Sequence, residues 1–290
     1  MDSSMWRQFA DFCKAELATG GPDPQLAIMT HLAKDSDVSE ALWLAGCYGA
    51  HHCVPSAFAV WHHFRPDSLL YDLDHVADWL DEHWQELSVR PEMRSHRMLQ
   101  KRVQCLHDFA RYAVETQLMY KDYDTIWQDS QQKVKYYGRY MAIKYLELLH
   151  RMTNKRSFAS YDIRAKHAWS PRKTLGILFP ENMHILANRY DNSDSAVTLS
   201  EAVATIAKNR LRDEGVEVSY FQLQVMLCEF KEFLEGGYYP GASHDEEMDY
   251  MAKSSSFDMT PIWEARAALF PHEYLGEFGG WSGIRKDRLR

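Results

Sequence analysis

The chain has 290 residues, of which 46% are apolar, and it contains 9 Trp, 16 Tyr and 13 Phe. This composition excludes an intrinsically disordered chain and suffices for one large or two modest domains with a real core. The net charge of −8 would by itself argue against a nucleic-acid partner. Neither a long apolar run nor a signal-peptide pattern is present, so we expect a cytoplasmic protein without a membrane partner.

Apolar residues recur at helical spacing along most of the chain, beginning with Trp6, Phe9 and Cys13. Residues 39–64 predict two helices, with a break at Gly49 and a second start near Pro55. Further amphipathic segments are predicted over 67–87, 97–120, 139–152, 198–212 and 218–235. Because alternation typical of strands is nearly absent, the sequence predicts an all-α fold.

Turn-forming residues gather at four places, namely 19–24, 153–158, 191–195 and 236–243. None of them resembles a long flexible linker. We therefore predict a helical core over 1–175 and a C-terminal helical extension over 176–290 that packs on this core.

The charges are distributed unevenly along these elements. Residues 1–89 carry 4 basic and 14 acidic side chains, whereas residues 90–173 carry 18 and 8. The excess is greatest over 133–173, with 11 basic and 2 acidic side chains. We favour a phosphate-binding surface over the alternative, in which these charges are solvated on opposite faces, because the basic block coincides with a glycine-containing turn.

That turn precedes the helix predicted at 139–152 and is centred on Gly138. A glycine turn at a helix N-terminus offers backbone N–H groups to a phosphate, so the sequence predicts a DNA contact here. A single carboxylate, Asp162, follows 24 residues later. Lys144 could assist, although its alternative is a solvated pair with Glu147 one turn away. The expected DNA-binding residues are Tyr137, Gly138, Arg139 and Lys144.

Three segments together resemble the helix-hairpin-helix DNA glycosylases. They are Tyr137-Gly138-Arg139-Tyr140-Met141-Ala142, Tyr161-Asp162-Ile163-Arg164 and the region 41–52. The resemblance spans roughly 38–172 and implies a helix-hairpin-helix core. It departs from the glycosylase pattern where Tyr136 replaces the first turn glycine and where Tyr140 stands in place of the lysine of lyase-active members. Iron–sulfur cysteines are also missing.

The fuller pattern resembles the phage amino acid:DNA transferases, also called α-glutamyl/putrescinyl-thymine pyrophosphorylases. The segments that carry this resemblance are 42–50, 94–97, 161–172, 226–231 and 238–241. It implies an enzyme that replaces the pyrophosphate of pyrophosphorylated 5-hydroxymethyluracil in DNA by an amino acid or polyamine, forming hypermodified thymine. A phage origin would place it in the cytoplasm of a bacterial host.

This reaction needs a flipped base, cations for the leaving pyrophosphate and an acceptor for the amine proton. From the resemblance we expect the catalytic residues to be Asp162, Arg164, Lys166 and His51. The expected substrate-binding residues are Tyr48, His52, Arg94, Arg97, Arg172, Tyr239 and Asp245. Four of these residues have a purely structural alternative. Asp162 could cap a helix, Arg94 and Arg97 could be solvated charges on a helix, and Asp245 could belong to a solvated helix start.

No nucleotide cofactor is predicted, since Rossmann and P-loop glycine patterns are absent. The histidines and the five scattered cysteines lack metal-ligand spacing, so no metal site is predicted. A magnesium ion could nevertheless accompany the pyrophosphate. Two alternatives stay open: a monofunctional base-excision glycosylase, which would release free base, and a helical DNA-binding protein without activity.

Overall fold

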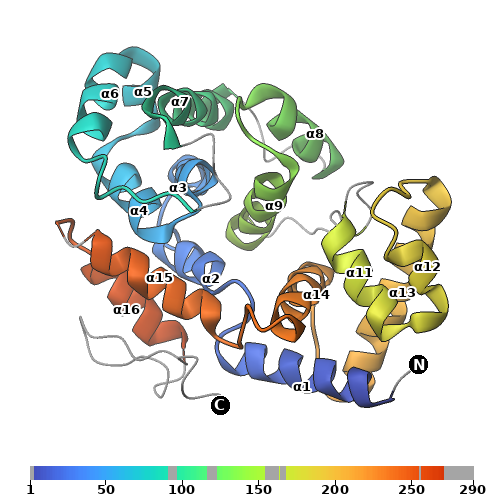
Figure 1. The fold of residues 1–290 in the computed structure, drawn as a ribbon. Helices are drawn as coiled ribbons and strands as arrows, with labels where there is room; N and C mark the ends of the chain where they lie inside the picture. The colour runs from blue at the N-terminus through green and yellow to red at the C-terminus, as the bar shows by residue number, and fades with distance from the viewer. Residues whose placement is uncertain are drawn as a thin grey trace.

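The computed structural model describes residues 3–90, 97–115, 123–153, 163, 168–254 and 256–270. All the regular structure in these ranges is helical, which confirms the all-α prediction (Figure 1). No helix within these ranges is both long and apolar enough to cross a membrane. The side chains gather in two hydrophobic clusters, and each takes helices from distant parts of the chain.

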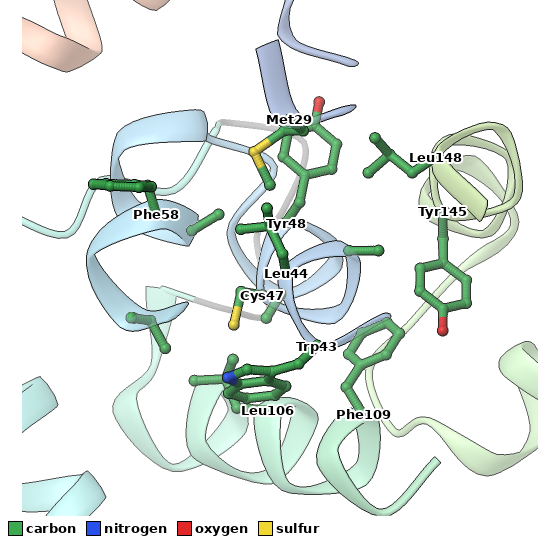
Figure 2. Packing of buried hydrophobic residues seen from close by; sticks show 14 of the residues in the cluster. Met29, Trp43, Leu44, Cys47, Tyr48, Phe58, Leu106, Phe109, Tyr145 and Leu148 are labelled. Atoms are coloured by element: carbon green, nitrogen blue, oxygen red, sulfur yellow. The ribbon is translucent and has the colours of Figure 1, made fainter. Parts of the chain in front are cut away.

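The first cluster contains the helices of residues 24–153 together with two helices of residues 242–269. Their bounds are α2 (Pro24–Leu32), α3 (Val38–His51), α4 (Val54–His63), α5 (Pro66–Tyr71), α6 (Leu73–Glu82), α7 (Leu99–Glu115), α8 (Tyr123–Lys133), α9 (Arg139–Thr153), α15 (Ala242–Lys253) and α16 (Thr260–Leu269). Helix α3 lies at the centre, between α4, α7 and α9 (Figure 2).

Helix α3 is longer than the sequence predicts. Asp37 caps its start by accepting a hydrogen bond from the Glu40 N–H at 2.9 Å, and the helix continues past Gly49 to His51. The break predicted at Gly49 is therefore wrong. Gly49 instead lets α7 approach, because a Cβ atom at this position would lie 2.6 Å from the ring of Phe109. The chain leaves the helix at His52, which adopts a left-handed φ of 49°.

The second cluster combines the N-terminal helix with helices from the later part of the chain. They are α1 (Ser3–Ala18), α11 (Trp169–Leu178), the 3-10 turn η3 (Pro180–Asn182), α12 (Met183–Leu186), α13 (Asp194–Asp213) and α14 (Tyr220–Leu234). Helix α1 lies along α14, where Phe9 meets Phe230 edge-on with ring centroids 5.0 Å apart (Figure 1). The division of the chain at residue 175 into two domains stays a prediction.

Two of these helices begin at clear capping residues. The hydroxyl of Ser193 accepts a hydrogen bond from the Ala196 N–H at the start of α13. Ser219 and Gln222 form a reciprocal capping box at the start of α14. Helices α9, α13 and α14 confirm the segments predicted at 139–152, 198–212 and 218–235. These caps stabilise the N-termini of α13 and α14.

Candidate active site

A cavity of about 810 Å³ lies between the two hydrophobic clusters. Its walls come from the start of α2, the end of α3, α9, the start of α11, α14 and α15. The polar and charged lining residues are Asp23, Gln25, His52, Arg90, Arg139, Lys144, Ser170, Arg189, Gln224, Cys228, Glu229, Glu232, Tyr238, Ser243 and Glu246. Cations and carboxylates therefore face one space large enough for a small molecule together with a base.

The N-terminus of α9 lies at the edge of this cavity, since Arg139 is its first residue and lines the wall. The turn between α8 and α9 is anchored by Val134 and Tyr137, whose side chains are buried in the first cluster. The Asp108 carboxylate accepts a hydrogen bond from the Lys135 N–H at 2.9 Å. This anchoring leaves Gly138 exposed, and apart from its chain neighbours no atom of the described residues lies within 4 Å of the place where a Cβ would stand.

Tyr136 occupies this turn with a left-handed φ of 62°. A non-glycine residue seldom adopts this conformation, which glycine takes without steric cost. Although Tyr136 stands where the glycosylase pattern has its first turn glycine, the backbone at this position therefore keeps a glycine-like conformation. The ring of Tyr136 is 48% exposed, and the Lys101 ammonium lies 5.3 Å from its centroid.

One wall of the cavity is built on a buried ion pair between Lys144 and Asp23. Gln25 donates a further hydrogen bond to Asp23 at 2.8 Å, and the Lys144 ammonium lies 5.3 Å from the Phe221 ring centroid. Glu147 pairs with Arg151 instead, at 3.0 Å. The solvated Lys144–Glu147 pair considered from the sequence is therefore absent, and Lys144 lies inside the protein.

The opposite wall contains a second buried ion pair. Arg90 donates hydrogen bonds to Glu246 and Glu247, and thereby joins the chain before residue 90 to α15. Burial lowers the pKa of Arg90, but the charges of Glu247 and Glu246 outweigh it and raise that pKa. Burial, and then the charges of Arg90 and Lys144, lower the pKa of His52 well below its ordinary value. His52 is therefore neutral at pH 7 and presents an uncharged imidazole to the cavity.

Two carboxyl groups and a phenol lie below these walls. Glu229 projects into the cavity from α14, and Glu16 of α1 lies behind it with 1% of its surface exposed. The hydroxyl of Tyr238 lies near both carboxyl groups, and its oxygen is 3.5 Å from that of the Ser243 hydroxyl. Burial raises the pKa of Glu16 to about 7. Burial, and then the charges of Glu16 and Asp23, raise the pKa of Glu229 well above its ordinary value.

Several residues predicted from the sequence meet around this cavity. His52, Arg139 and Lys144 line it, and the ring of Tyr48 meets that of His52 edge-on at 5.5 Å. Tyr239 follows the lining residue Tyr238. Asp245 belongs to α15, but its side chain lies outside the described part of the structure.

Other predicted residues lie elsewhere. His51 is buried, with its Nδ1 2.9 Å from the Cys47 carbonyl oxygen. Arg172 is also buried and donates to the Asp191 carbonyl at 3.1 Å, beyond the cavity wall. Arg97 is exposed outside the cavity. Tyr137 is a core residue whose hydroxyl donates to the Met141 carbonyl at 2.8 Å.

The basic block at 133–173 does not form one open surface among its described members. Lys144 and Arg172 are buried, and Lys133 pairs with Asp129 at 3.0 Å. The predicted residues Asp162, Arg164, Lys166 and Arg94 lie outside the described ranges. The described neighbours of Asp162, Arg164 and Lys166 in the sequence, Ile163 and Ala168, are buried, and the cavity lining includes residues 168–171.

The sequence did not single out five residues that shape the site: Glu16, Asp23, Arg90, Glu229 and Tyr238. Glu229 and Tyr238 lie within segments that carry the family resemblance, so those segments held the available signal. Glu16 and Asp23 looked like ordinary acids in an acidic N-terminal region. Only the tertiary structure brings them to α9 and α14.

Several of the described histidines pack on aromatic rings. His62 stacks on Phe58 at 5.8 Å, and His63 stacks on Trp79 at 4.5 Å. Within the ranges that the structure describes, no group of three or more His, Cys, Asp or Glu side chains has the arrangement of a metal site. A magnesium ion that arrives with pyrophosphate stays a prediction.

Comparison with known proteins gives one match. The family model described as amino acid:DNA transferase matches residues 20–238, which include most of the cavity lining. No curated protein and no solved structure matches the chain.

Proposed function

The chain belongs to the amino acid:DNA transferase family and is a transferase, and on this basis we propose that the cavity joins an amine donor to a modified thymine base of DNA. The proposed base is pyrophosphorylated 5-hydroxymethyluracil, and the donor is a free amino acid or polyamine. The amine nitrogen forms a bond to the C5 methylene carbon as the bond from that carbon to the pyrophosphate oxygen breaks.

The observation that carries this proposal is the position of the cavity. Its lining includes Arg139, the residue that directly follows the exposed Gly138 at the N-terminus of α9, where N–H groups and the helix dipole favour a phosphate. DNA held there would lie close enough to extend a flipped base into the cavity. Among the described residues beyond its chain neighbours, no side chain lies within 4 Å of a Cβ placed at Gly138, which leaves room for a phosphate to approach.

Charged residues of the cavity lining can bind both the departing pyrophosphate and the incoming donor ammonium. Arg139 and Arg189 are cations of the lining that can stabilise the charge that develops on the departing pyrophosphate. Glu229 and Glu232 provide the negative side, where a donor ammonium can bind. By family resemblance, Asp162, Arg164 and Lys166 also take part in this reaction. In the sequence they precede the lining residues 168–171.

Nucleoside mass spectrometry tests this function. DNA that contains pyrophosphorylated 5-hydroxymethyluracil is incubated with the protein and a pool of amino acids and polyamines, then digested. We expect a nucleoside heavier than thymidine by one amine adduct, with its yield strongly reduced in Arg139→Gln and Asp162→Asn. Arg212→Gln, the same substitution at an exposed position of α13, serves as the control for Arg139.

Released free base would instead identify a glycosylase, which cleaves the bond between base and sugar. Bound DNA with unchanged nucleosides would identify a binding protein. Either result overturns the transfer reaction proposed for this cavity.

A further inference from the structure

Glu16 and Glu229 come from opposite ends of the sequence and form a pair of carboxyl groups below the cavity. Glu16 is fixed in place, because its Oε1 accepts a hydrogen bond from the Gly241 N–H at 3.2 Å. The Tyr238 hydroxyl lies near both carboxyls and has a single proton to donate. The Oε2 atoms of Glu16 and Glu229 are buried and have no hydrogen-bond partner among the described residues.

A buried carboxyl pair of this kind holds protons more tightly than isolated carboxyls do. Burial raises the pKa of both groups, and the charge of Glu16 adds to the rise at Glu229. The hydrogen bonds from Gly241 and Tyr238 favour the charged form of Glu16, so Glu16 ionises first. Glu229 then holds its proton more tightly than Glu16 does, until a positive charge enters the cavity.

The other groups that face the pair fix its electrostatic balance. Asp23 acts on both carboxyls and favours their protonated forms, whereas the ammonium of Lys144 favours the charged form of Glu229. The thiols of Cys13 and Cys228 also lie close. Burial raises the pKa of both thiols, that of Cys228 to about 11, so both are neutral here. Lys144 is already paired with Asp23, and Glu229 is the member of the carboxyl pair that faces the cavity.

We propose that Glu229 accepts the proton that the donor ammonium must lose, and that Glu16 is a positioning residue that controls how tightly Glu229 holds a proton. This inference rests on the proposed transfer reaction. The positive charge of an incoming ammonium favours ionised Glu229, whose own proton leaves to solvent as the donor binds. One proton then passes from nitrogen to the carboxylate, and the nitrogen lone pair becomes available for attack.

The step balances as follows. The lone pair of the amine forms the C–N bond, and the electron pair of the broken C–O bond leaves with pyrophosphate. The proton taken from the ammonium resides on Glu229 and is released to solvent when product departs. Neither oxidant nor reductant takes part. A carboxyl with raised proton affinity suits this task, because its affinity is closer to that of an amine.

Three variants test the assignment in single-turnover reactions followed by nucleoside mass spectrometry over a range of pH. Glu229→Gln should lower the rate of adduct formation about 100-fold or more with unchanged DNA affinity. Glu16→Gln should shift the half-maximal pH of the rate downward, because it removes a negative charge that raises the pKa of Glu229. Glu235→Gln, on the exposed end of α14, is the control.

Both carboxyl substitutions should preserve the fold, since glutamine has the shape and neutrality of a protonated glutamate, and thermal melting verifies this. A full rate in Glu229→Gln overturns the inference. So does a Glu16→Gln variant that is slower but has an unchanged pH midpoint, which would show a merely structural role. An unmodified protein that forms no adduct overturns the transfer reaction itself, so the two failures are distinguishable.

Discussion

Gly138 is the residue at which the sequence and the structure agree most directly. The sequence predicts a phosphate contact from a glycine at a helix start, and the structure leaves this glycine exposed beside the cavity. Its neighbour Tyr136 could not be interpreted in the same way. A tyrosine in a turn gives no sign that it will adopt a φ of 62°, which depends on the buried anchors Val134 and Tyr137.

Substitution of Gly138 by glutamate separates helix stability from DNA binding. An acidic group in the first turn stabilises a helix by about 0.3–1 kcal/mol, so we expect α9 and the fold to persist. The same charge repels a phosphate, so DNA affinity should fall, and the salt dependence of binding should decrease by about one phosphate contact. Fluorescence anisotropy at several salt concentrations measures both. Gly138→Gln controls for size and should bind nearly as the unmodified protein does; equal binding by Gly138→Glu would contradict the contact.

Glu16 should make stability depend on pH. Its pKa is about 7 in the fold and close to 4.5 when unfolded, so the folded protein binds more protons between these values. The stability that this group contributes is complete below pH 4.5 and is lost as pH rises through about 7. Glu16→Gln cannot ionise, so from pH 5 to 8 its stability relative to the unmodified protein should improve, by up to a few kcal/mol.

Urea unfolding at pH 5, 6, 7 and 8 measures this difference. Glu229 acts in the same direction, and His52 in the opposite one, since its lowered pKa removes stability as pH falls below about 6.5. Comparison of each variant with the unmodified protein at the same pH isolates Glu16. Glu235→Gln, whose side chain is half exposed, should show a constant difference; a constant difference for Glu16→Gln would refute the raised pKa.

At the scale of elements, helical periodicity identified the long amphipathic helices but not the tight packing between them. The sequence treats a glycine within 39–64 as a helix break. In the structure, Gly46 and Gly49 are where α3 and α7 approach, and added Cβ atoms would lie 2.9 and 2.6 Å from Phe109. Local propensity contains no information about a ring that arrives from another helix, so this error was unavoidable without tertiary contacts.

Gly49→Ala tests that packing. Alanine is the better helix former by about 1 kcal/mol, so an isolated α3 would become more stable. In the protein the new methyl group collides with Phe109, and we expect a net destabilisation of about 1–3 kcal/mol in urea unfolding. The loss should be smaller in a Phe109→Leu background, where the ring is absent. Equal losses in both backgrounds would show that the collision with Phe109 is not the cause.

At the scale of the whole molecule, the sequence predicted the all-α fold and the family correctly. It did not predict which distant segments meet at one site. The residues around the cavity come from positions as distant as Asp23 and Glu246. Long-range pairs such as Arg90 with Glu247 have no sequence signal in a single chain. Charge type and spacing identified His52, Arg139 and Lys144, because these belong to recognisable segments.

Arg90 connects these distant parts, so its loss should affect global stability. Its side chain and that of Glu247 are 8% and 4% exposed. Arg90→Met would leave Glu247 buried without its cation, and we expect a loss of about 3–5 kcal/mol in the free energy of unfolding. Glu246→Gln, which removes the 58% exposed partner of the same guanidinium, should cost less than about 1 kcal/mol. The reverse order would contradict this assignment of the buried pair.

The placement of α1 has a consequence for how the protein is made. This helix leaves the ribosome well before its partners, because its apolar face, with Trp6, Phe9 and Phe12, is covered by helices that begin only at Trp169. At ordinary rates of translation, roughly 10–30 seconds separate the synthesis of α1 from that of its partners. During that interval the aromatic face of α1 remains open to chaperones and to incorrect partners. Helix α1 is thus synthesised before α11 but can reach its final place only after α11 to α14 have been made.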